Sequence, residues 1–109
     1  MPNTQGSSRI EELRRHAGVA CDLLKVLANE DRLLLLCQLS SGPHAVCELE
    51  ATLGIRQPTL SQQLAVLRQN ALVHTERDGK HIRYSLANPD VERIMRTLWE
   101  IYCASHRQE

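Results

Sequence analysis

Residues 55–86 read IRQPTLSQQLAVLRQNALVHTERDGKHIRYSL, and this stretch decides the fold of the chain. Pro58 indicates the start of a helix. The backbone N–H groups of the first helical turn have no helical partner, so proline, which has no N–H group, is tolerated there. Leucines then recur at helical spacing, at positions 60, 64 and 67, and predict a face that packs on a core. The positions between them are polar and mostly uncharged. Hydroxyl and carboxamide groups in such a row hydrogen-bond base edges and phosphates, so this helix is predicted to contact DNA.

Two alternating runs follow this helix, at residues 72–76 and 81–86, and Asp78-Gly79 between them is a strong hairpin signal. Basic residues surround the predicted tip of the hairpin: Arg77, Lys80, His81 and Arg83. A polar helix followed at once by a basic hairpin predicts a winged helix-turn-helix. The alternative is a small α+β domain in which the polar face of the helix is only solvated.

The predicted DNA contacts form two groups. Residues expected close to DNA at the start of the helix are Gln57, Thr59, Ser61, Gln62 and Gln63. Residues expected on phosphates are Arg68 of the helix and Arg77, Lys80 and His81 of the hairpin. The formal net charge of the whole chain is zero, but residues 55–83 hold five basic side chains against two acidic ones. Positive charge is therefore concentrated in the segment that is predicted to bind DNA.

The composition predicts one globular domain. The chain has 109 residues, of which 42% are hydrophobic, and it holds no phenylalanine and only one tryptophan, so the core must be mainly aliphatic. The longest apolar run, residues 33–37, is too short to span a membrane. Because the N-terminus also lacks the basic-then-apolar pattern of an export signal, we expect a cytoplasmic protein with no membrane partner.

The predicted fold class is α+β, mainly helical, with about five helices and a two-stranded wing. A small, polar, disordered tail is expected at residues 1–8 and a single domain at residues 9–109. Helices are expected from about residue 9, over residues 30–40, from residue 44 or 45 to residue 53, and after Pro89. An apolar stripe runs along the first helix: Leu13, Ala17, Ala20, Leu24 and Leu27. Terminal helices of this kind predict a homodimer with recognition helices about 34 Å apart. The alternative is a monomer whose stripes belong to its own core.

Three segments resemble the ArsR/SmtB family of bacterial winged-helix repressors. They are LLKVLANEDRLLLLCQL at residues 23–39, VCELEATLGIRQPTLSQQLAVLRQNALV at residues 46–73, and ERDGKHIRYSL at residues 76–86. The order and spacing of the segments carry the resemblance. It implies a homodimer that binds an operator with a two-fold repeat and blocks transcription until an inducer lowers its affinity for DNA.

Four cysteines, Cys21, Cys37, Cys47 and Cys103, form no CxxC pair and are expected to be reduced thiols. Within the family, the chain most resembles the persulfide and redox sensors of the BigR, SqrR, YgaV and HlyU type, whose two cysteines lie in segments like RLLLLCQL at residues 32–39 and LWEIYC at residues 98–103. The resemblance implies that a reactive sulfur species or an oxidant joins Cys37 and Cys103 by a disulfide or a longer sulfur bridge. A cysteine within a leucine run can instead be an inert core residue. Cys21 and Cys47 lie outside the pattern and are expected to be structural.

A metal-responsive repressor is the alternative within the family. The family's Cys-x-Cys site is matched here by Ala45-Val46-Cys47, where alanine replaces the first cysteine, so soft-metal binding is not expected. A second family site, on the last helix, is matched by Asp90, Glu92, Cys103 and His106, which could hold zinc. No cofactor is expected, and no motif supports a thiol enzyme, so the chain is not expected to be an enzyme.

Overall fold

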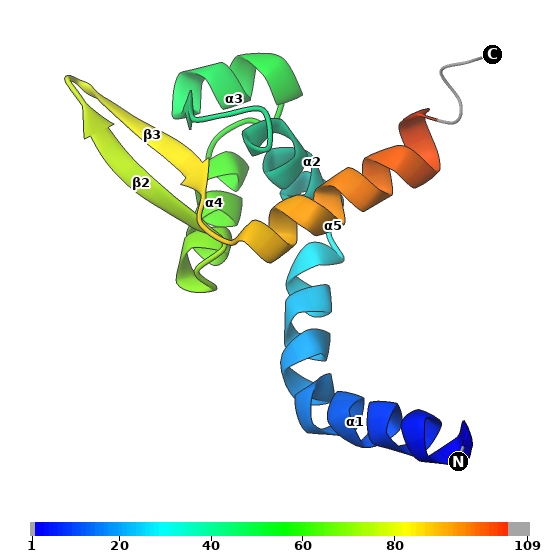
Figure 1. Cartoon of the computed structure of the whole chain (residues 1–109). Coiled ribbons are helices and arrows are strands. Elements are labelled where there is room, and N and C mark those ends of the chain that lie inside the picture. The colour runs from blue at the N-terminus through cyan, green and yellow to red at the C-terminus, as the bar shows by residue number, and fades with distance from the viewer. Residues whose placement is uncertain (1, 105–109) are drawn as a thin grey trace.

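The computed structural model describes residues 2–104 and the side chains of residues 8–104. The elements along the chain are α1 (Pro2–Leu27), α2 (Glu30–Leu39), β1 (His44–Ala45), α3 (Val46–Leu53), α4 (Thr59–Gln69), β2 (Val73–Asp78), β3 (His81–Leu86), α5 (Pro89–Trp99) and the π-helix η1 (Glu100–Ala104). Figure 1 shows the β2–β3 hairpin projecting on one side of the molecule and α1 extending away from it on another. The predicted winged helix-turn-helix, α+β and mainly helical, is confirmed.

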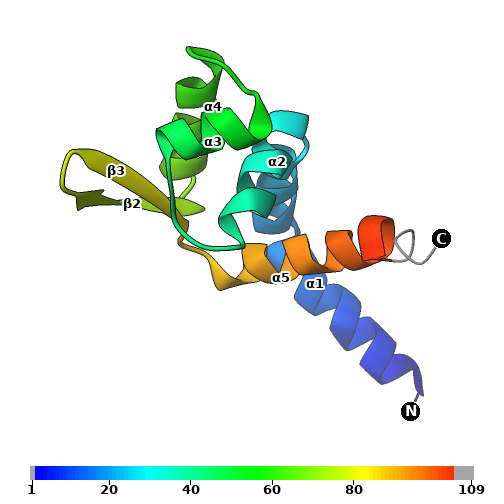
Figure 2. The ribbon, with the colours of Figure 1, turned by 90° about the horizontal axis from the view of Figure 1, so that it is seen from above.

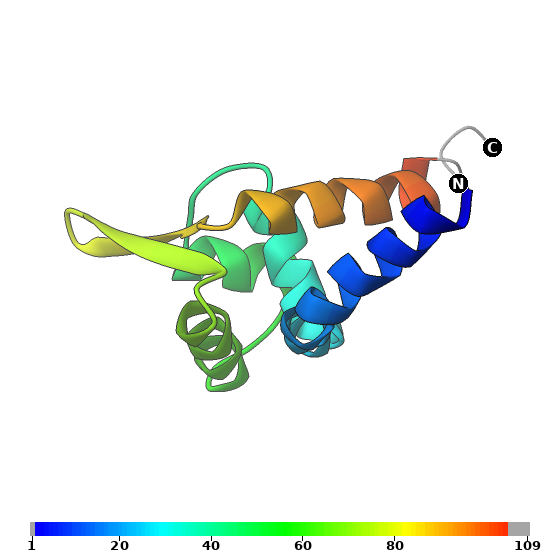
Figure 3. The ribbon, with the colours of Figure 1, turned by 60° about the horizontal axis from the view of Figure 1, so that its bottom comes forward.

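The core lies between the helices and is built mainly from leucine. The largest fully buried side chains are Leu35, Leu36, Leu49, Leu60, Leu64, Leu67 and Val91. The three leucines predicted to face the core from α4 are therefore all buried, and full burial of one such side chain stabilises the fold by roughly 1.5–3 kcal/mol. Contacts of α2 with both α4 and α5 place it between them, as Figure 2 and Figure 3 show from two sides. This packing holds α4 with its polar face outward.

A third strand joins the predicted hairpin. Strands β2 and β3 pair antiparallel from Val73↔Leu86 to Asp78↔His81, and Gly79 in the turn has a φ of 64°, which glycine adopts without strain. The short strand β1 adds to the other edge of β3, so the sheet order is β1-β3-β2. The wing was predicted with two strands, and β1 was missed because two residues are too few to show an alternating pattern.

Asparagine side chains begin two helices and a glycine ends a third, close to the predicted boundaries. Asn29 Oδ1 accepts a hydrogen bond from Arg32 N at the start of α2, and Asn88 Oδ1 accepts one from Asp90 N at the start of α5. Gly54, with a φ of 70°, ends α3 in the left-handed conformation. Helix α3 begins at Val46, because the residues before it belong to β1.

Helix α1 is longer than the sequence pattern indicates. It begins at Pro2 instead of near Arg9, so the structure places residues of the expected tail within the helix. Those residues carry no apolar stripe, and an apolar stripe was the signal used to find helices. Of the stripe itself, only Leu27 is buried, whereas Leu13 and Leu24 are each 58% exposed. Helix α1 therefore presents apolar side chains that the described chain does not cover. None of the helices described is both long and apolar enough to cross a membrane.

Candidate nucleic-acid interface and cysteine pair

The exposed face of α4 begins at a cap made by Gln57. Its Oε1 accepts hydrogen bonds from the backbone N of Ser61 at 3.1 Å and from Ser61 Oγ at 2.7 Å. The backbone N–H of Ser61 belongs to the first turn of the helix, where such groups lack a helical partner. Thr59 and Gln62 are exposed on the same turn. The structure thus brings these four predicted DNA-contacting residues together, with Gln57 and Ser61 bonded to each other.

The rest of the exposed face leads toward the wing. Gln63 is half-buried and its Oε1 accepts a hydrogen bond from Arg32 Nη1 at 3.0 Å, whereas Arg68 near the end of α4 is exposed. An open cleft of about 460 Å³ is lined by Ser61, Ala65, Arg68, Gln69 and Tyr84. Because Tyr84 belongs to β3, this cleft connects the exposed face of α4 with the wing.

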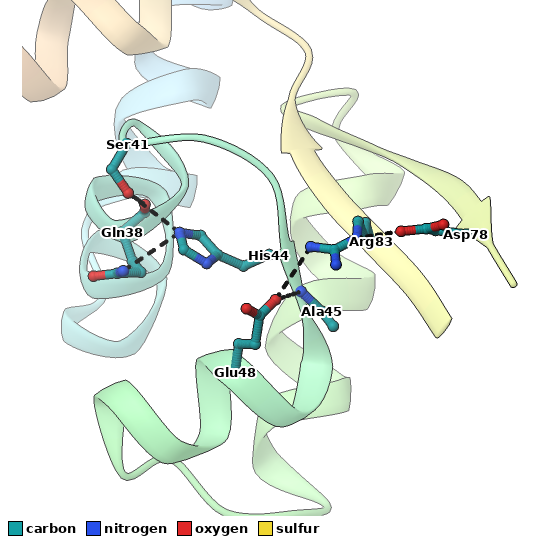
Figure 4. Close-up of polar contacts among 7 residues, drawn as sticks. All are labelled: Gln38, Ser41, His44, Ala45, Glu48, Asp78 and Arg83. Atoms are coloured by element: carbon teal, nitrogen blue, oxygen red, sulfur yellow. Dashed lines mark hydrogen bonds and ion pairs between the residues drawn. The ribbon is translucent and has the colours of Figure 1, made fainter. Parts of the chain in front are cut away.

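The basic residues of the wing differ in their surroundings. Arg77, Lys80 and His81 are exposed around the hairpin tip. Arg83 is half-buried, and it donates from Nε to Asp78 Oδ2 at 2.8 Å and from Nη1 to Glu48 Oε1 at 3.4 Å (Figure 4). The hydrogen bond to Asp78, with a smaller effect of the Glu48 charge, raises the pKa of Arg83. Arg83 is therefore a cation that two carboxylates already balance.

Glu48 connects the wing with the start of α3. Its Oε1 accepts a hydrogen bond from Ala45 N at 2.7 Å, in the manner of a capping box. This hydrogen bond is the main cause that lowers the pKa of Glu48; desolvation opposes it, and the nearby charges of Arg83, His44 and His81 add to the lowering. Glu48 therefore stays ionised and holds β1, α3 and β3 together.

His44 extends this set of polar contacts to the end of α2. Its Nε2 lies 3.4 Å from Gln38 Nε2 and 3.2 Å from Ser41 Oγ (Figure 4). Gln38 directly follows Cys37 in the chain. Polar contacts thus run from the neighbourhood of Cys37, through β1, to α3 and the wing.

Cys37 lies at the surface of α2, beside α5. It is exposed, so it does not belong to the leucine core despite its place in a leucine run. An open cleft of about 460 Å³ is lined by Cys37, Gln38, Ser40, Ser41, Glu92, Met95, Arg96 and Trp99. Cys103 is half-buried in η1, which continues directly from the end of α5 at Trp99. The side chain of Cys37 therefore borders the helix that leads to Cys103. Cys21 and Cys47, expected as structural thiols, are both exposed.

Comparison with known proteins identifies the family. Residues 29–75 match the family described as bacterial regulatory protein, arsR family. The chain is also 46% identical over 99 residues to the biofilm growth-associated repressor of Agrobacterium fabrum, which covers 91% of this chain and 85% of that protein. This chain belongs to the ArsR family. It is 34% identical to the transcriptional activator HlyU of Vibrio cholerae over 98% of its own length and 100% of that protein.

Solved structures of ArsR-family proteins share the fold. The transcriptional repressor BigR from Xylella fastidiosa aligns with a TM-score of 0.82 and 42% identity, over 86% of this chain and 96% of that chain. Reduced HlyU from Vibrio cholerae aligns with a TM-score of 0.80 and 36% identity, over 85% and 98% of the two chains. Both belong to the subgroup that the cysteine pattern indicates, so the resemblance seen in the sequence is confirmed.

The residues matched to a zinc site of the ArsR family are not assembled in the described part of this chain. Asp90 is paired with Arg93 at 3.6 Å and Glu92 with Arg96 at 3.4 Å, all on the exposed surface of α5. Cys103 lies in η1, and His106 lies outside the described residues. Within residues 2–104, no group of three histidine, cysteine or acidic side chains could hold a metal ion.

Two interactions near α4 and the wing were not found from the sequence of this ArsR-family protein. One is the pairing of Arg83 with Glu48, which joins residues 35 positions apart; the acidic residue at the third position of α3 signals only the hydrogen bond from Ala45 N. The other is the hydrogen bond between Arg32 and Gln63, which joins residues 31 positions apart and left no local signal.

Proposed function

We propose that this protein is a homodimeric DNA-binding transcriptional repressor whose operator binding is switched by thiol chemistry at Cys37 and Cys103. The observation that carries the DNA-binding part is the cleft that joins the exposed polar face of α4 to Tyr84 of the wing, whose tip carries exposed basic side chains. Gln57, Thr59, Ser61, Gln62 and Gln63 lie close to DNA in this proposal, and Arg68, Arg77, Lys80 and His81 contact phosphates. Contacts to phosphates make binding strongly dependent on salt.

Exposed apolar side chains support a dimer formed by the terminal helices. They lie on α1 and on η1, which continues α5: Ile10, Leu13, Val19, Leu24 and Tyr102. Large exposed apolar patches mark interfaces, because leaving them in water is unfavourable. Replacing Leu13 with glutamate should shift the protein to a monomer in analytical ultracentrifugation, whereas replacing Leu34, an exposed leucine of α2, should not. Unchanged sedimentation of the Leu13→Glu variant would refute this interface.

The exposure of Cys37 beside the helix that leads to Cys103 supports the thiol switch. The Cys37 thiolate attacks the outer sulfur of an organic persulfide, forms Cys37–S–SH and releases the organic thiol. The Cys103 thiolate then attacks the inner sulfur, forms the disulfide and releases hydrosulfide. Two thiols are oxidised and one sulfane sulfur is reduced. The bridge ties the end of α5 to α2, and α2 contacts α4 directly, so α4 moves relative to its half-site.

Fluorescence anisotropy of the reduced protein with DNA from its own upstream region tests both parts. We expect tight binding that weakens steeply with salt, release by an organic persulfide, and no release in Cys37→Ser and Cys103→Ser variants. A Cys47→Ser variant, which alters an exposed cysteine outside the pair, is the control and should respond like the wild type. Release of the Cys37→Ser protein by persulfide would refute the thiol switch. Release by zinc alone would favour a metal site that uses Asp90, Glu92, Cys103 and His106.

A further inference from the structure

Arg32, in the first turn of α2, joins three helices through one guanidinium group. Its Nε donates a hydrogen bond to Val26 O at 2.6 Å, its Nη2 to Lys25 O at 3.4 Å, and its Nη1 to Gln63 Oε1 at 3.0 Å. Its backbone N donates to Asn29 Oδ1 at 3.0 Å. The end of α1, the start of α2 and the middle of α4 therefore meet at a single side chain.

The contacts with Lys25 and Val26 fasten the end of α1. Carbonyl groups in the last turn of a helix have no helical partner, and a cation at that end is favourable because the helix dipole is negative there. The carbonyls of Leu24 and Leu27 accept hydrogen bonds from the backbone of residues 28 and 29. Arg32 supplies donors to the two carbonyls between them, which fixes the last turn of α1 against α2.

The contact with Gln63 determines which way its amide group is turned. A guanidinium group has only donors, so the amide must offer its oxygen to Arg32. The NH₂ group of Gln63 then points away from Arg32, and donors are what Gln63 has left to offer a ligand. Such donors match phosphate oxygens, the O6 and N7 of guanine, and the O4 of thymine. They do not match the amino group of adenine, which needs an acceptor.

We propose that Arg32 is a positioning residue for DNA recognition: it turns the Gln63 amide so that its donors face the nucleic acid, and it ties that side chain to the end of α1. This inference rests on the proposed role of α4 as the helix that contacts DNA. Lysine cannot replace Arg32 in this role, because a single ammonium nitrogen does not offer the planar, diverging donors that reach three acceptors on two helices.

Operator binding by four variants tests the proposal. Arg32→Lys and Gln63→Met should each weaken binding to operator DNA about tenfold, and the double variant should bind no more weakly than either single variant, because both remove the same interaction. Binding to unrelated DNA should change by less than about twofold, since charge is conserved and phosphate contacts dominate there. Arg93→Lys is the control, because it makes the same chemical change at an exposed arginine that, within the described residues, is paired with its helix neighbour Asp90.

The outcomes separate this proposal from the one that it rests on. If Gln62→Ala, at an exposed position of α4, leaves operator affinity unchanged, the assignment of α4 as the contacting helix fails. If Gln62→Ala weakens binding but Arg32→Lys does not, or if the effects of Arg32→Lys and Gln63→Met add, Arg32 does not position Gln63. Should Arg32→Lys fail to fold, the NMR signals of the Arg32 guanidinium provide the test. Their chemical shifts must differ between the wild type and the Gln63→Met variant, and unchanged shifts overturn the proposal.

Discussion

Arg83 Nε lies 2.8 Å from Asp78 Oδ2, so a carboxylate at the tip of the wing holds one of the wing's own arginines. A second carboxylate, that of Glu48, lies 3.4 Å from Arg83 Nη1. The wing therefore presents less positive charge than its sequence indicates. This arrangement makes the charge of the wing adjustable by single substitutions.

Replacing Asp78 with asparagine should strengthen DNA binding. The substitution removes one negative charge from the hairpin tip and leaves Arg83 able to turn toward a phosphate. We expect the affinity to rise about threefold at low salt. The slope of log affinity against log salt concentration should steepen by about one, which corresponds to one more released ion. Anisotropy titrations over a series of salt concentrations measure both. Asp90→Asn, on α5 and away from the wing, is the control. An unchanged slope for Asp78→Asn would show that Arg83 does not reach DNA.

Glu48 should make stability depend on acid pH. Because the hydrogen bond from Ala45 N lowers the pKa of Glu48 from its usual 4.5, the native state binds the proton less readily than the unfolded state does. The stabilising effect is complete above pH 4.5 and is lost as the pH falls from there through the lower pKa of the native state. Glu48→Gln should therefore lose less stability between pH 5 and about pH 3 than the wild type.

Urea unfolding at a series of pH values measures this effect. Glu50→Gln, on the same helix but outside the contact with Ala45, is the control and should follow the wild type. If Glu48→Gln and the wild type lose stability in parallel below pH 4.5, the hydrogen bond to Ala45 N does not contribute to folding.

Local patterns were sufficient to predict most of the fold. Leucine spacing predicted the buried face of α4, and Asp78-Gly79 predicted the hairpin. Each of these signals involves residues close in the sequence, and the corresponding physical cause is equally local. The start of α1 was predicted too late, because its first residues lack an apolar stripe.

The candidate site was predicted less completely, because its polar contacts join distant residues. Arg32 and Gln63 are 31 positions apart, and Glu48 and Arg83 are 35 positions apart. Which guanidinium reaches which acceptor depends on how α2, α3, α4 and the sheet pack, and the chain pattern contains no signal for this. The sequence therefore indicated which residue types are available for binding DNA but not which of them are already engaged.

A leucine of α4 tests how strongly the core holds the helix that we propose contacts DNA. Leu64 is 1% exposed and lies on the face of α4 opposite the polar side chains. Leu64→Ala should lower the free energy of unfolding by about 2–5 kcal/mol, because it removes buried methyl groups and leaves a cavity. Leu34→Ala on α2, where the side chain is 48% exposed, should cost less than about 1 kcal/mol. Urea unfolding at one fixed protein concentration compares them, and equal losses would contradict the assigned core.

Trp99 provides a spectroscopic test of the thiol switch. It is the only tryptophan in the chain, it is 44% exposed, and it lines the same cleft as Cys37 on the helix that leads to Cys103. A sulfur bridge between the two cysteines would draw the end of α5 toward α2 and remove Trp99 from water. We therefore expect an organic persulfide to shift the fluorescence emission of the wild type to shorter wavelength, and dithiothreitol to reverse the shift. Cys47→Ser should behave like the wild type, whereas the same shift in Cys37→Ser would mean that the cleft closes without the proposed bridge.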